Sequence, residues 1–258
     1  MPRYHLERQG PVVRLSLANP PLNTLDIPLM EELSGVIRQL LAAKGSERPR
    51  AIVLASAVPG QFSQGVDPKA VLTTNVDGRK RIFLALGDLV EALWFAYVPI
   101  VADISGPALA GGAVLATVAD FAVIDRAHGK IAYSEVKVGL PVPLFVQRLV
   151  HRKVNPAAWN DVLLLGRNID AEEACRIGFA NASYGTPAER DEALGAILGR
   201  ITRLPPAALT ETLRQGRSPD RGLLHHFRDN LAEFADFLTE DFLEKGLKAV
   251  VKGESPKF

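Results

Sequence analysis

The sequence has little of several residue types that carry chemistry or anchor a chain in place. Cys175 is the single cysteine, so no internal disulfide can form, and the five histidines are scattered rather than grouped at the spacing of zinc ligands. No apolar run approaches the roughly 18 residues that cross a bilayer, and residues 1–7 lack the apolar core of a signal peptide. We therefore expect a cytoplasmic protein with no metal site and no membrane contact.

An excess of charge of one sign is also absent. The 258 residues include 30 basic and 29 acidic side chains, for a net charge of +1, which gives no broad attraction for nucleic acid or an anionic membrane. No basic cluster with interleaved aromatic residues indicates an RNA-binding surface. Hydrophobic residues make up 47% of the sequence, enough for a large core in one main domain. Any anion that the protein binds must be met by a local site.

Hydrophobic periodicity predicts an α/β architecture. Residues 12–17 alternate as a strand does, residues 27–41 carry apolar side chains at helical spacing, and residues 51–55 form the continuous apolar run of a buried strand. This order makes a βαβ unit. The sequence therefore predicts parallel strands connected by helices. The alternation continues with a helix at 81–94, a strand at 100–104, a helix within 106–119 and a strand at 121–124.

Beyond Pro143 the pattern changes and predicts helices almost to the end of the chain. A turn at 216–220 precedes a long terminal helix whose wide apolar surface reaches residue 250. Such a surface needs a partner, which is either the rest of the chain or a neighbouring subunit. We therefore predict a core over residues 1–200 and a helical segment over residues 201–258.

Two glycine-bearing loops that follow buried strands are candidates for anion binding. They lie at residues 62–67 and 106–112, and the second leads into a helix. The first amides of a helix have no acceptor within it and carry partial positive charge, so they stabilise an anion or a developing oxyanion. Glycines at such turns also serve close packing alone. The loops do not match the phosphate loop of nucleoside triphosphatases.

These motifs, taken in order, resemble the crotonase (enoyl-CoA hydratase/isomerase) superfamily along nearly the whole chain. The resemblance implies an α/β fold with a spiral core of ββα units and a C-terminal helical trimerisation segment. It implies a homotrimer or a hexamer, with the terminal helices packed across subunits. The matching stretches lie at residues 19–25, 62–67, 106–119, 134–140, 165–174 and 177–179.

The resemblance also implies a catalytic site. The amides of Val66 and Gly111 correspond to those that hold the thioester oxygen, and Glu135 corresponds to a catalytic glutamate of the family. Hydratases carry a second glutamate where this chain has Val114, which cannot bind or activate water. One carboxylate suffices to move a proton along an acyl chain. Residues 19–23, 107–112 and 237–247 also resemble mitochondrial-type 3,2-enoyl-CoA isomerases more than hydratases. The acyl-CoA thioester is then the substrate, and no cofactor is expected.

Further residues are assigned to the substrate by the same resemblance. Lys69 corresponds to a lysine near the CoA phosphates, Gln64 and Val66 lie where the adenine binds, and Lys245 and Lys248 could reach a neighbour's CoA. Aromatic and proline residues of the acyl pocket would be Tyr133, Pro141, Phe145 and Trp94, whereas His128 and His151 are expected to be structural. The complete set of predicted substrate contacts is Gln64, Asp67, Lys69, Leu22, Thr24, Gly65, Gly112, Val114 and Leu140.

Two other functions stay open on the sequence alone. Crotonase folds host many enolate reactions on acyl-CoA, including hydration and decarboxylation, because a fold does not fix a reaction. A non-catalytic module that binds acyl-CoA or RNA is the other alternative. In every catalytic case a buried Glu135 should have a raised pKa, since burial disfavours its charged form.

Overall fold

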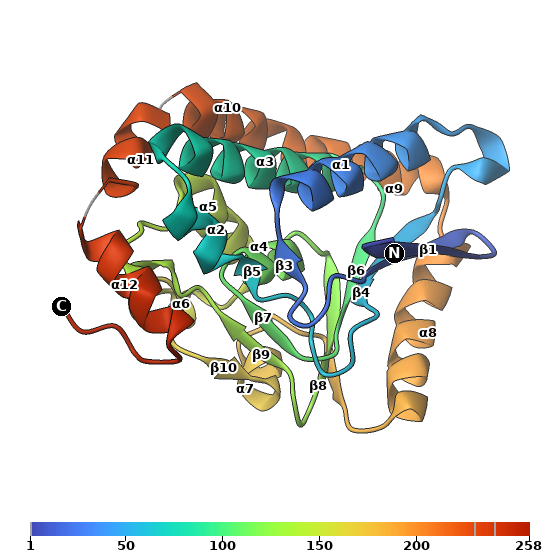
Figure 1. The fold of residues 1–258 in the computed structure, drawn as a ribbon. Coiled ribbons are helices and arrows are strands. Elements are labelled where there is room, and N and C mark those ends of the chain that lie inside the picture. Colours follow the sequence, from blue (N-terminus) through green and yellow to red (C-terminus); the bar gives the residue numbers. More distant parts are fainter. Residues whose placement is uncertain (1, 230, 240) are drawn as a thin grey trace.

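The computed structural model describes residues 2–229, 231–239 and 241–258 and is built on a six-stranded sheet (Figure 1). The first strand pairs antiparallel with the second, and the remaining pairs are parallel. The predicted α/β core with parallel strands is therefore confirmed. In sheet order the strands are β1 (Tyr4–Gln9), β2 (Val12–Leu17), β4 (Ala51–Ser56), β6 (Ile100–Ile104), β8 (Phe121–Asp125) and β11 (Ala182–Tyr184).

Two small sheets extend from the ends of these strands. A two-stranded parallel sheet joins β3 (Thr24–Leu25) to β5 (Gly65–Val66). A three-stranded sheet pairs β9 (Lys130–Ala132) with β7 (Pro107–Leu109) on one side and β10 (Ile169–Asp170) on the other. Both glycine-bearing loops are thereby fixed by main-chain pairing.

Helices cover the sheet on both faces, and their starts follow local capping rules. The Asp26 side chain accepts a hydrogen bond from the Leu29 amide at 2.8 Å, and Asn75 accepts from Gly78 at 2.9 Å, so α1 and α3 begin at caps. The helices up to residue 220 are α1 (Ile27–Ala42), η1 (Gly45–Glu47), α2 (Pro68–Thr73), α3 (Val76–Trp94), α4 (Gly111–Thr117), η2 (Glu135–Val138), α5 (Leu144–Lys153), η3 (Pro156–Ala158), α6 (Trp159–Leu163), α7 (Ala171–Arg176), α8 (Pro187–Arg203), α9 (Pro206–Arg217) and η4 (Ser218–Asp220).

Alternate residues of each central strand enter different cores. Ile52 and Leu54 belong to the large core on one face, together with residues of α1 and α3. Val53 points to the other face, where a smaller core includes Leu194 and Ile201 of α8. Burial on both faces explains the continuous apolar runs that predicted these strands.

The region beyond residue 143 differs from the prediction in two ways. It is not helical throughout, because β11 pairs with β8 in the main sheet and β10 pairs with β9. The long terminal helix is instead described as α10 (Arg221–Asp229), α11 (Leu231–Phe237) and α12 (Asp241–Val251). After α11 the amides of Leu238 and Thr239 bond three residues back, which ends the helical pattern.

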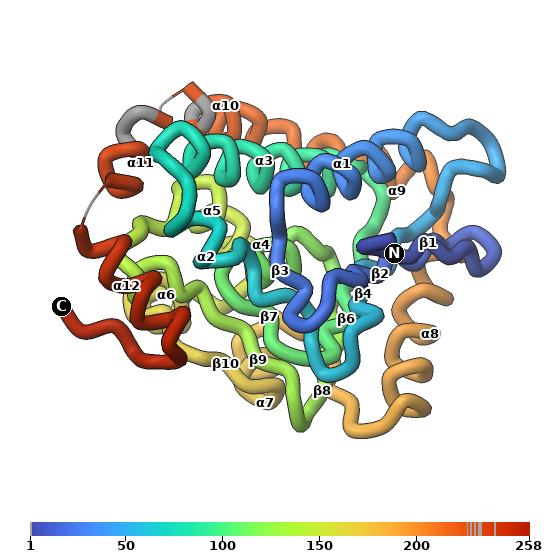
Figure 2. Tube along the Cα trace, viewed as in Figure 1, coloured from blue at the N-terminus to red at the C-terminus, as the bar shows by residue number. Residues whose placement is uncertain are grey.

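These terminal helices lie against earlier elements of the same chain (Figure 2). Helix α10 contacts α3 and α5, α11 contacts α3, and α12 contacts α2 and η2. The ring of Phe227 packs edge-on against Phe145 and Phe234, with centroids 5.2 and 5.6 Å apart. Of the two partners that the sequence left open for this surface, the structure shows contacts with the rest of the chain. In the described part of the chain, every helix is too short or too polar to cross a bilayer.

Candidate active site

A cavity of about 510 Å³ lies where the loops after β4 and β6 meet η2 and α12. This volume is within the range of roughly 300–1,000 Å³ typical of small-molecule sites. The wall is mainly apolar and carries few polar side chains. Its apolar side chains are Leu22, Val66, Val71, Phe83, Leu86, Leu109, Val138, Leu140, Leu247, Val250 and Val251.

Glu135 begins the short helix η2 and lines this cavity. Its Oε2 atom is buried and has no hydrogen-bond partner among the described residues. Burial raises the pKa of Glu135 to about 7, and a bond to its own backbone acts weakly in the opposite direction. A carboxyl group with one unpaired oxygen and such a pKa exchanges a proton readily near neutral pH.

The two glycine-bearing loops approach each other beside this carboxyl group. A β-carbon added to Gly111 would lie 3.5 Å from the Val66 amide nitrogen and 3.4 Å from the Gly65 α-carbon. Gly111 is the first residue of α4, so its amide has no acceptor within the helix. The backbones that carry the two predicted amide donors are therefore adjacent, and Val66 and Gly111 both line the cavity.

Glycine is required at two neighbouring positions for steric reasons. Gly65 has φ +76°, and a β-carbon there would lie 2.6 Å from the Gly111 amide nitrogen. A β-carbon on Gly112 would lie 2.0 Å from the Ser63 carbonyl oxygen. Neither Gly65 nor Gly112 lines the cavity. Their role is to let the two loops come together, rather than the substrate contact predicted for them.

Ala110, the residue before α4, has an unusual backbone conformation. Its φ is +47° and its ψ is −122°, a region that costs a residue with a β-carbon about 1–3 kcal/mol. The Ala110 amide donates to the Ala132 carbonyl at 2.8 Å, and its carbonyl accepts from Val114 at 3.0 Å. These bonds hold the strained residue in place and set the direction of the peptide plane that carries the Gly111 amide.

A buried hydrogen bond joins the segment of Glu135 to helix α4. The Tyr133 hydroxyl, two residues before Glu135, bonds to the Thr117 hydroxyl, and Thr117 in turn donates to the Ala113 carbonyl at 2.6 Å. Tyr133 is fully buried, and burial raises its pKa far above the usual range. The acid/base candidate and the helix that carries Gly111 are thus fixed to one another.

Most predicted contacts lie on the cavity wall, although their roles differ. The Asp67 carboxylate accepts from the Lys69 amide at 2.9 Å and caps α2, while the Lys69 side chain is exposed. Val114 is not on the wall, because its side chain is buried in the large core. The predicted residues that line the cavity are Glu135, Val66, Gly111, Leu22, Thr24, Gln64, Asp67, Lys69 and Leu140.

The predicted aromatic lining of the acyl pocket is wrong. Tyr133 is buried behind Glu135, Phe145 packs against Phe227, Trp94 lines a different cavity, and Pro141 is not on the wall. The wall is instead completed by side chains of α2, α3 and α12. Their apolar periodicity is visible in the sequence, but it is the same for core and cavity residues, so no signal distinguishes them.

The remaining candidates lie away from the cavity. His128 pairs with Asp125 at 3.1 Å on an exposed turn, and His151 stacks on Trp159 with centroids 3.9 Å apart. Lys248 pairs with Glu244 along α12. No group of three or more histidine, cysteine or acidic side chains among the described residues could hold a metal ion.

Known proteins resemble this chain along nearly its whole length. The family described as Enoyl-CoA hydratase/isomerase matches residues 7–258. A putative enoyl-CoA hydratase of Thermus thermophilus is 30% identical over 238 residues, which cover 90% of this chain and 92% of that protein. The human mitochondrial enoyl-CoA delta isomerase 1 is 24% identical over 239 residues, covering 92% of this chain and 78% of that protein.

Solved structures share the fold. The crystal structure of human mitochondrial delta3-delta2-enoyl-CoA isomerase has a TM-score of 0.91 at 21% identity and covers 98% of each chain. An enoyl-CoA hydratase from Bacillus halodurans has a TM-score of 0.82 at 21% identity, covering 96% of this chain and all of that one. The crotonase fold predicted from the sequence is confirmed, and the chain belongs to the enoyl-CoA hydratase/isomerase family.

Proposed function

We propose that this protein is an enoyl-CoA isomerase that converts a 3-enoyl-CoA into the conjugated 2-enoyl-CoA. The observation that carries the proposal is the unpaired Glu135 carboxyl group in an apolar cavity, beside the adjacent backbones of Val66 and Gly111. A single base that gives up and regains one proton is what a double-bond shift requires.

In the proposed mechanism, ionised Glu135 takes a proton from the carbon next to the thioester carbonyl. The electrons of that C–H bond move toward the carbonyl, and negative charge develops on the thioester oxygen. The N–H groups of Val66 and Gly111 donate to this oxygen, and one such donor is typically worth about 3 kcal/mol. Protonated Glu135 then returns the proton two carbons further along, and the double bond ends between the second and third carbons.

The chemistry of the wall favours this reaction over hydration. Glu135 and Asp67 are the two acidic side chains among the described wall residues, and Asp67 is occupied as a helix cap. The position at which hydratases carry a second glutamate is Val114, an apolar residue buried in the core. No second carboxylate is then available there to activate water.

Hydration is the second candidate, because relatives at 30% identity include proteins named as a hydratase and a carnitinyl-CoA dehydratase. Relatives named as enoyl-CoA delta isomerases are 21–28% identical. The names of the relatives therefore do not decide between the two reactions. The residue at position 114 and the single unpaired carboxyl group are the basis for ranking isomerisation first.

We also propose that the CoA moiety crosses the rim near Gln64 and Lys69, where Lys69 is exposed and free to meet a phosphate. The apolar side chains of α3 and α12 would then bind the acyl chain. Assembly into a trimer or hexamer remains a prediction of the family resemblance, to be measured by sedimentation.

The decisive experiment supplies the purified protein with 3-hexenoyl-CoA and, separately, with crotonyl-CoA, and follows the absorbance of the conjugated thioester. Isomerisation raises the signal from 3-hexenoyl-CoA and leaves crotonyl-CoA unchanged. A falling crotonyl-CoA signal without any rise from 3-hexenoyl-CoA would establish hydration and reject the proposed reaction.

A further inference from the structure

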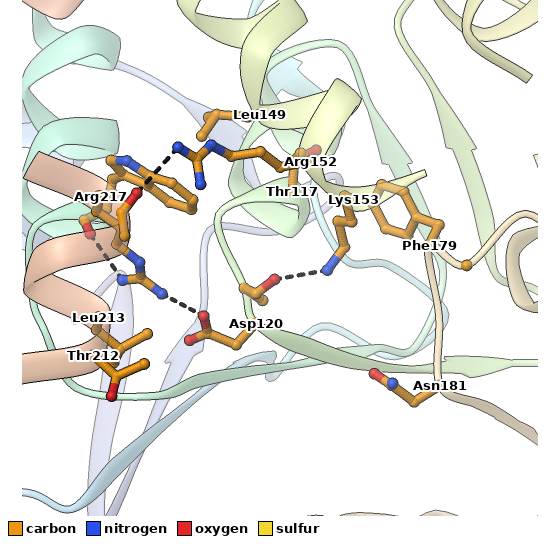
Figure 3. A pocket seen from close by; sticks show the side chains of 14 residues that line it. Thr117, Asp120, Leu149, Arg152, Lys153, Phe179, Asn181, Thr212, Leu213 and Arg217 are labelled. Carbon is orange, nitrogen blue, oxygen red and sulfur yellow. Dashed lines mark hydrogen bonds and ion pairs between the residues drawn. The ribbon is translucent and has the colours of Figure 1, made fainter. Parts of the chain in front are cut away.

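A second cavity, of about 300 Å³, lies at the opposite end of α4 from Gly111 (Figure 3). Thr117, Ala119, Phe179, Leu149 and Trp94 form a floor in which every residue is less than a tenth exposed. The exposed rim comes from α5 and α9 and includes Arg152, Thr212 and Gly216. None of these residues belongs to the wall of the candidate active site.

Positive charge exceeds negative charge in this second cavity. Its charged lining side chains are Arg152, Lys153, Arg217 and Asp120. Arg217 is 3% exposed and pairs with Asp120, and Arg152 pairs with Asp220 at 3.2 Å. Lys153 has no carboxylate within ion-pair distance among the described residues, and its ammonium group lies 5.1 Å from the centre of the Phe179 ring.

The Asp120 carboxylate is already committed to other donors. One oxygen accepts from Arg217, and the other accepts from the Ile100 amide at 2.9 Å. Figure 3 shows Asp120 between Arg217 on one side and Lys153 on the other. The negative charge of Asp120 therefore attracts the Lys153 ammonium group at a distance, while both Asp120 oxygens already accept hydrogen bonds from other donors.

Two side chains that line the cavity have N–H groups without a hydrogen-bond acceptor among the described residues. The Lys153 ammonium group donates to the Ala119 carbonyl at 2.6 Å, which uses one of its three N–H bonds. The Asn181 side-chain oxygen accepts from the Ala122 amide at 2.9 Å, so its NH₂ group is left as a donor. Burial lowers the pKa of Lys153 to about 8, with Asp120 acting in the opposite direction, and the ammonium form still predominates at neutral pH.

We propose that this cavity, which Lys153 and Asn181 both line, is a binding site for a compact oxyanion such as phosphate or a short carboxylate. Lys153 is half-buried. A cation that is partly removed from water and has no carboxylate partner is costly, and an anion that accepts its N–H bonds offsets that cost. The volume is at the low end for ligand sites, which favours a small anion over a nucleotide.

The site is independent of the proposed isomerase chemistry. Its test is equilibrium binding of inorganic phosphate, measured by calorimetry and by the rise in melting temperature, against chloride at equal ionic strength. Acetate forms the second arm, and the tighter of the two probes identifies the class of oxyanion. We expect saturable binding of one anion per chain.

Two substitutions make the test specific. Lys153→Met removes the charge but keeps the length of the side chain, and Thr212→Glu adds a competing carboxylate on the exposed rim without touching the floor. Each should weaken phosphate binding at least about tenfold. Thr212→Glu keeps the proposal testable even if Lys153→Met fails to fold.

Glu135→Gln and saturating CoA separate this site from the candidate active site. Neither should alter phosphate affinity, since neither acts on the second cavity. The proposal is overturned if the wild-type protein does not bind either probe, if Thr212→Glu binds phosphate as tightly as wild type, or if CoA displaces the anion.

Discussion

The two ends of helix α4 each have a carboxyl group close by, and the two groups differ in their partners. Glu135, in the cavity beside Gly111, has a buried oxygen without any hydrogen-bond partner. Asp120, three residues beyond the end of α4, accepts from Arg217 and from the Ile100 amide. Hydrogen-bond donors that pair with a carboxylate keep it ionised and stabilise the fold, whereas a carboxyl group that lacks such donors can exchange its proton. The hydrogen-bond donors around a carboxyl group thus distinguish the structural Asp120 from Glu135, the proposed acid/base.

The largest effect should come from Glu135→Gln, which removes the mobile proton and keeps the shape of the side chain. Turnover of 3-hexenoyl-CoA should fall by about 100- to 10,000-fold, the usual contribution of a general base. Affinity for CoA, measured by calorimetry, should change little. The matched control is Asp67→Asn, which keeps the oxygen that caps α2 and should retain near-native turnover. Native turnover in Glu135→Gln would remove this carboxyl group from the mechanism.

Gly111→Ala tests the amide donors without altering a polar group. The added methyl would sit 3.5 Å from the Val66 nitrogen, a distance that the fold tolerates but that fills the space for the thioester oxygen. We expect a loss in kcat of about 100- to 1,000-fold with a near-native melting temperature.

Gly35→Ala is the control for this substitution. Gly35 lies in α1 with nothing within 4 Å of an added β-carbon, so the variant should be slightly more stable and fully active. An equal loss of kcat in both variants would mean that the effect at Gly111 is not local to the cavity.

Stability should respond in opposite directions at the two ends of α4. Asp120→Asn leaves the buried Arg217 without its carboxylate and should lower the free energy of unfolding by about 3–5 kcal/mol. Glu135→Gln should raise it at pH 8 by on the order of 3 kcal/mol, because the folded-state pKa of about 7 lies above the ordinary value near 4.5.

The sign of this effect sets its pH window. Folded Glu135 holds a proton that the unfolded chain releases between about pH 4.5 and 7, so the wild-type protein loses stability as pH rises through that window. The advantage of Glu135→Gln should therefore vanish near pH 4. Because the ionised form is the base, kcat/KM should rise about tenfold per pH unit below pH 7 and level off above it. Denaturant titrations at pH 4 and 8 and a pH–rate profile check both statements.

The smallest effect should come from Tyr133→Phe, which cuts the bond between the Glu135 segment and α4. The lost hydrogen bond should cost about 1 kcal/mol of stability and reduce kcat by less than tenfold, with KM unchanged. Tyr184→Phe removes a comparable buried bond, the 2.9 Å contact to Asp103 on the other face of the sheet. It should cost similar stability and leave kcat intact. Equal kcat in the two variants would show that the Tyr133 bond does not position Glu135.

The parts of the fold that were predictable from the sequence are those in which burial produces a recognisable pattern of apolar residues. Strands β4, β6 and β8 are continuous apolar runs because both of their faces are covered. Strand β1 was not predicted, because most of its residues are exposed and carry no apolar alternation. Strands β10 and β11 have two and three residues, too few for any period to show.

The site was predictable where a motif specifies the backbone, and unpredictable where distant segments converge. Glu135, Val66 and Gly111 lie in motifs that the family resemblance carries, and the structure brings them to one cavity. Leu247 and Val250 were seen only as one face of a terminal helix, and nothing local shows that this face closes the cavity of its own chain. The positive φ of Ala110 has no signal either, since alanine seldom adopts it.

The order in which the walls of the candidate active site occur along the chain has a consequence for biosynthesis. Leu247, Val250 and Val251 form part of the wall around the proposed acyl site, and they are synthesised after the loops that carry Gly111 and Glu135. While the chain is still being made, the loops with Glu135 and Gly111 can fold, but the acyl site lacks one side. The wall of the proposed acyl site is therefore complete only after translation has passed codon 251.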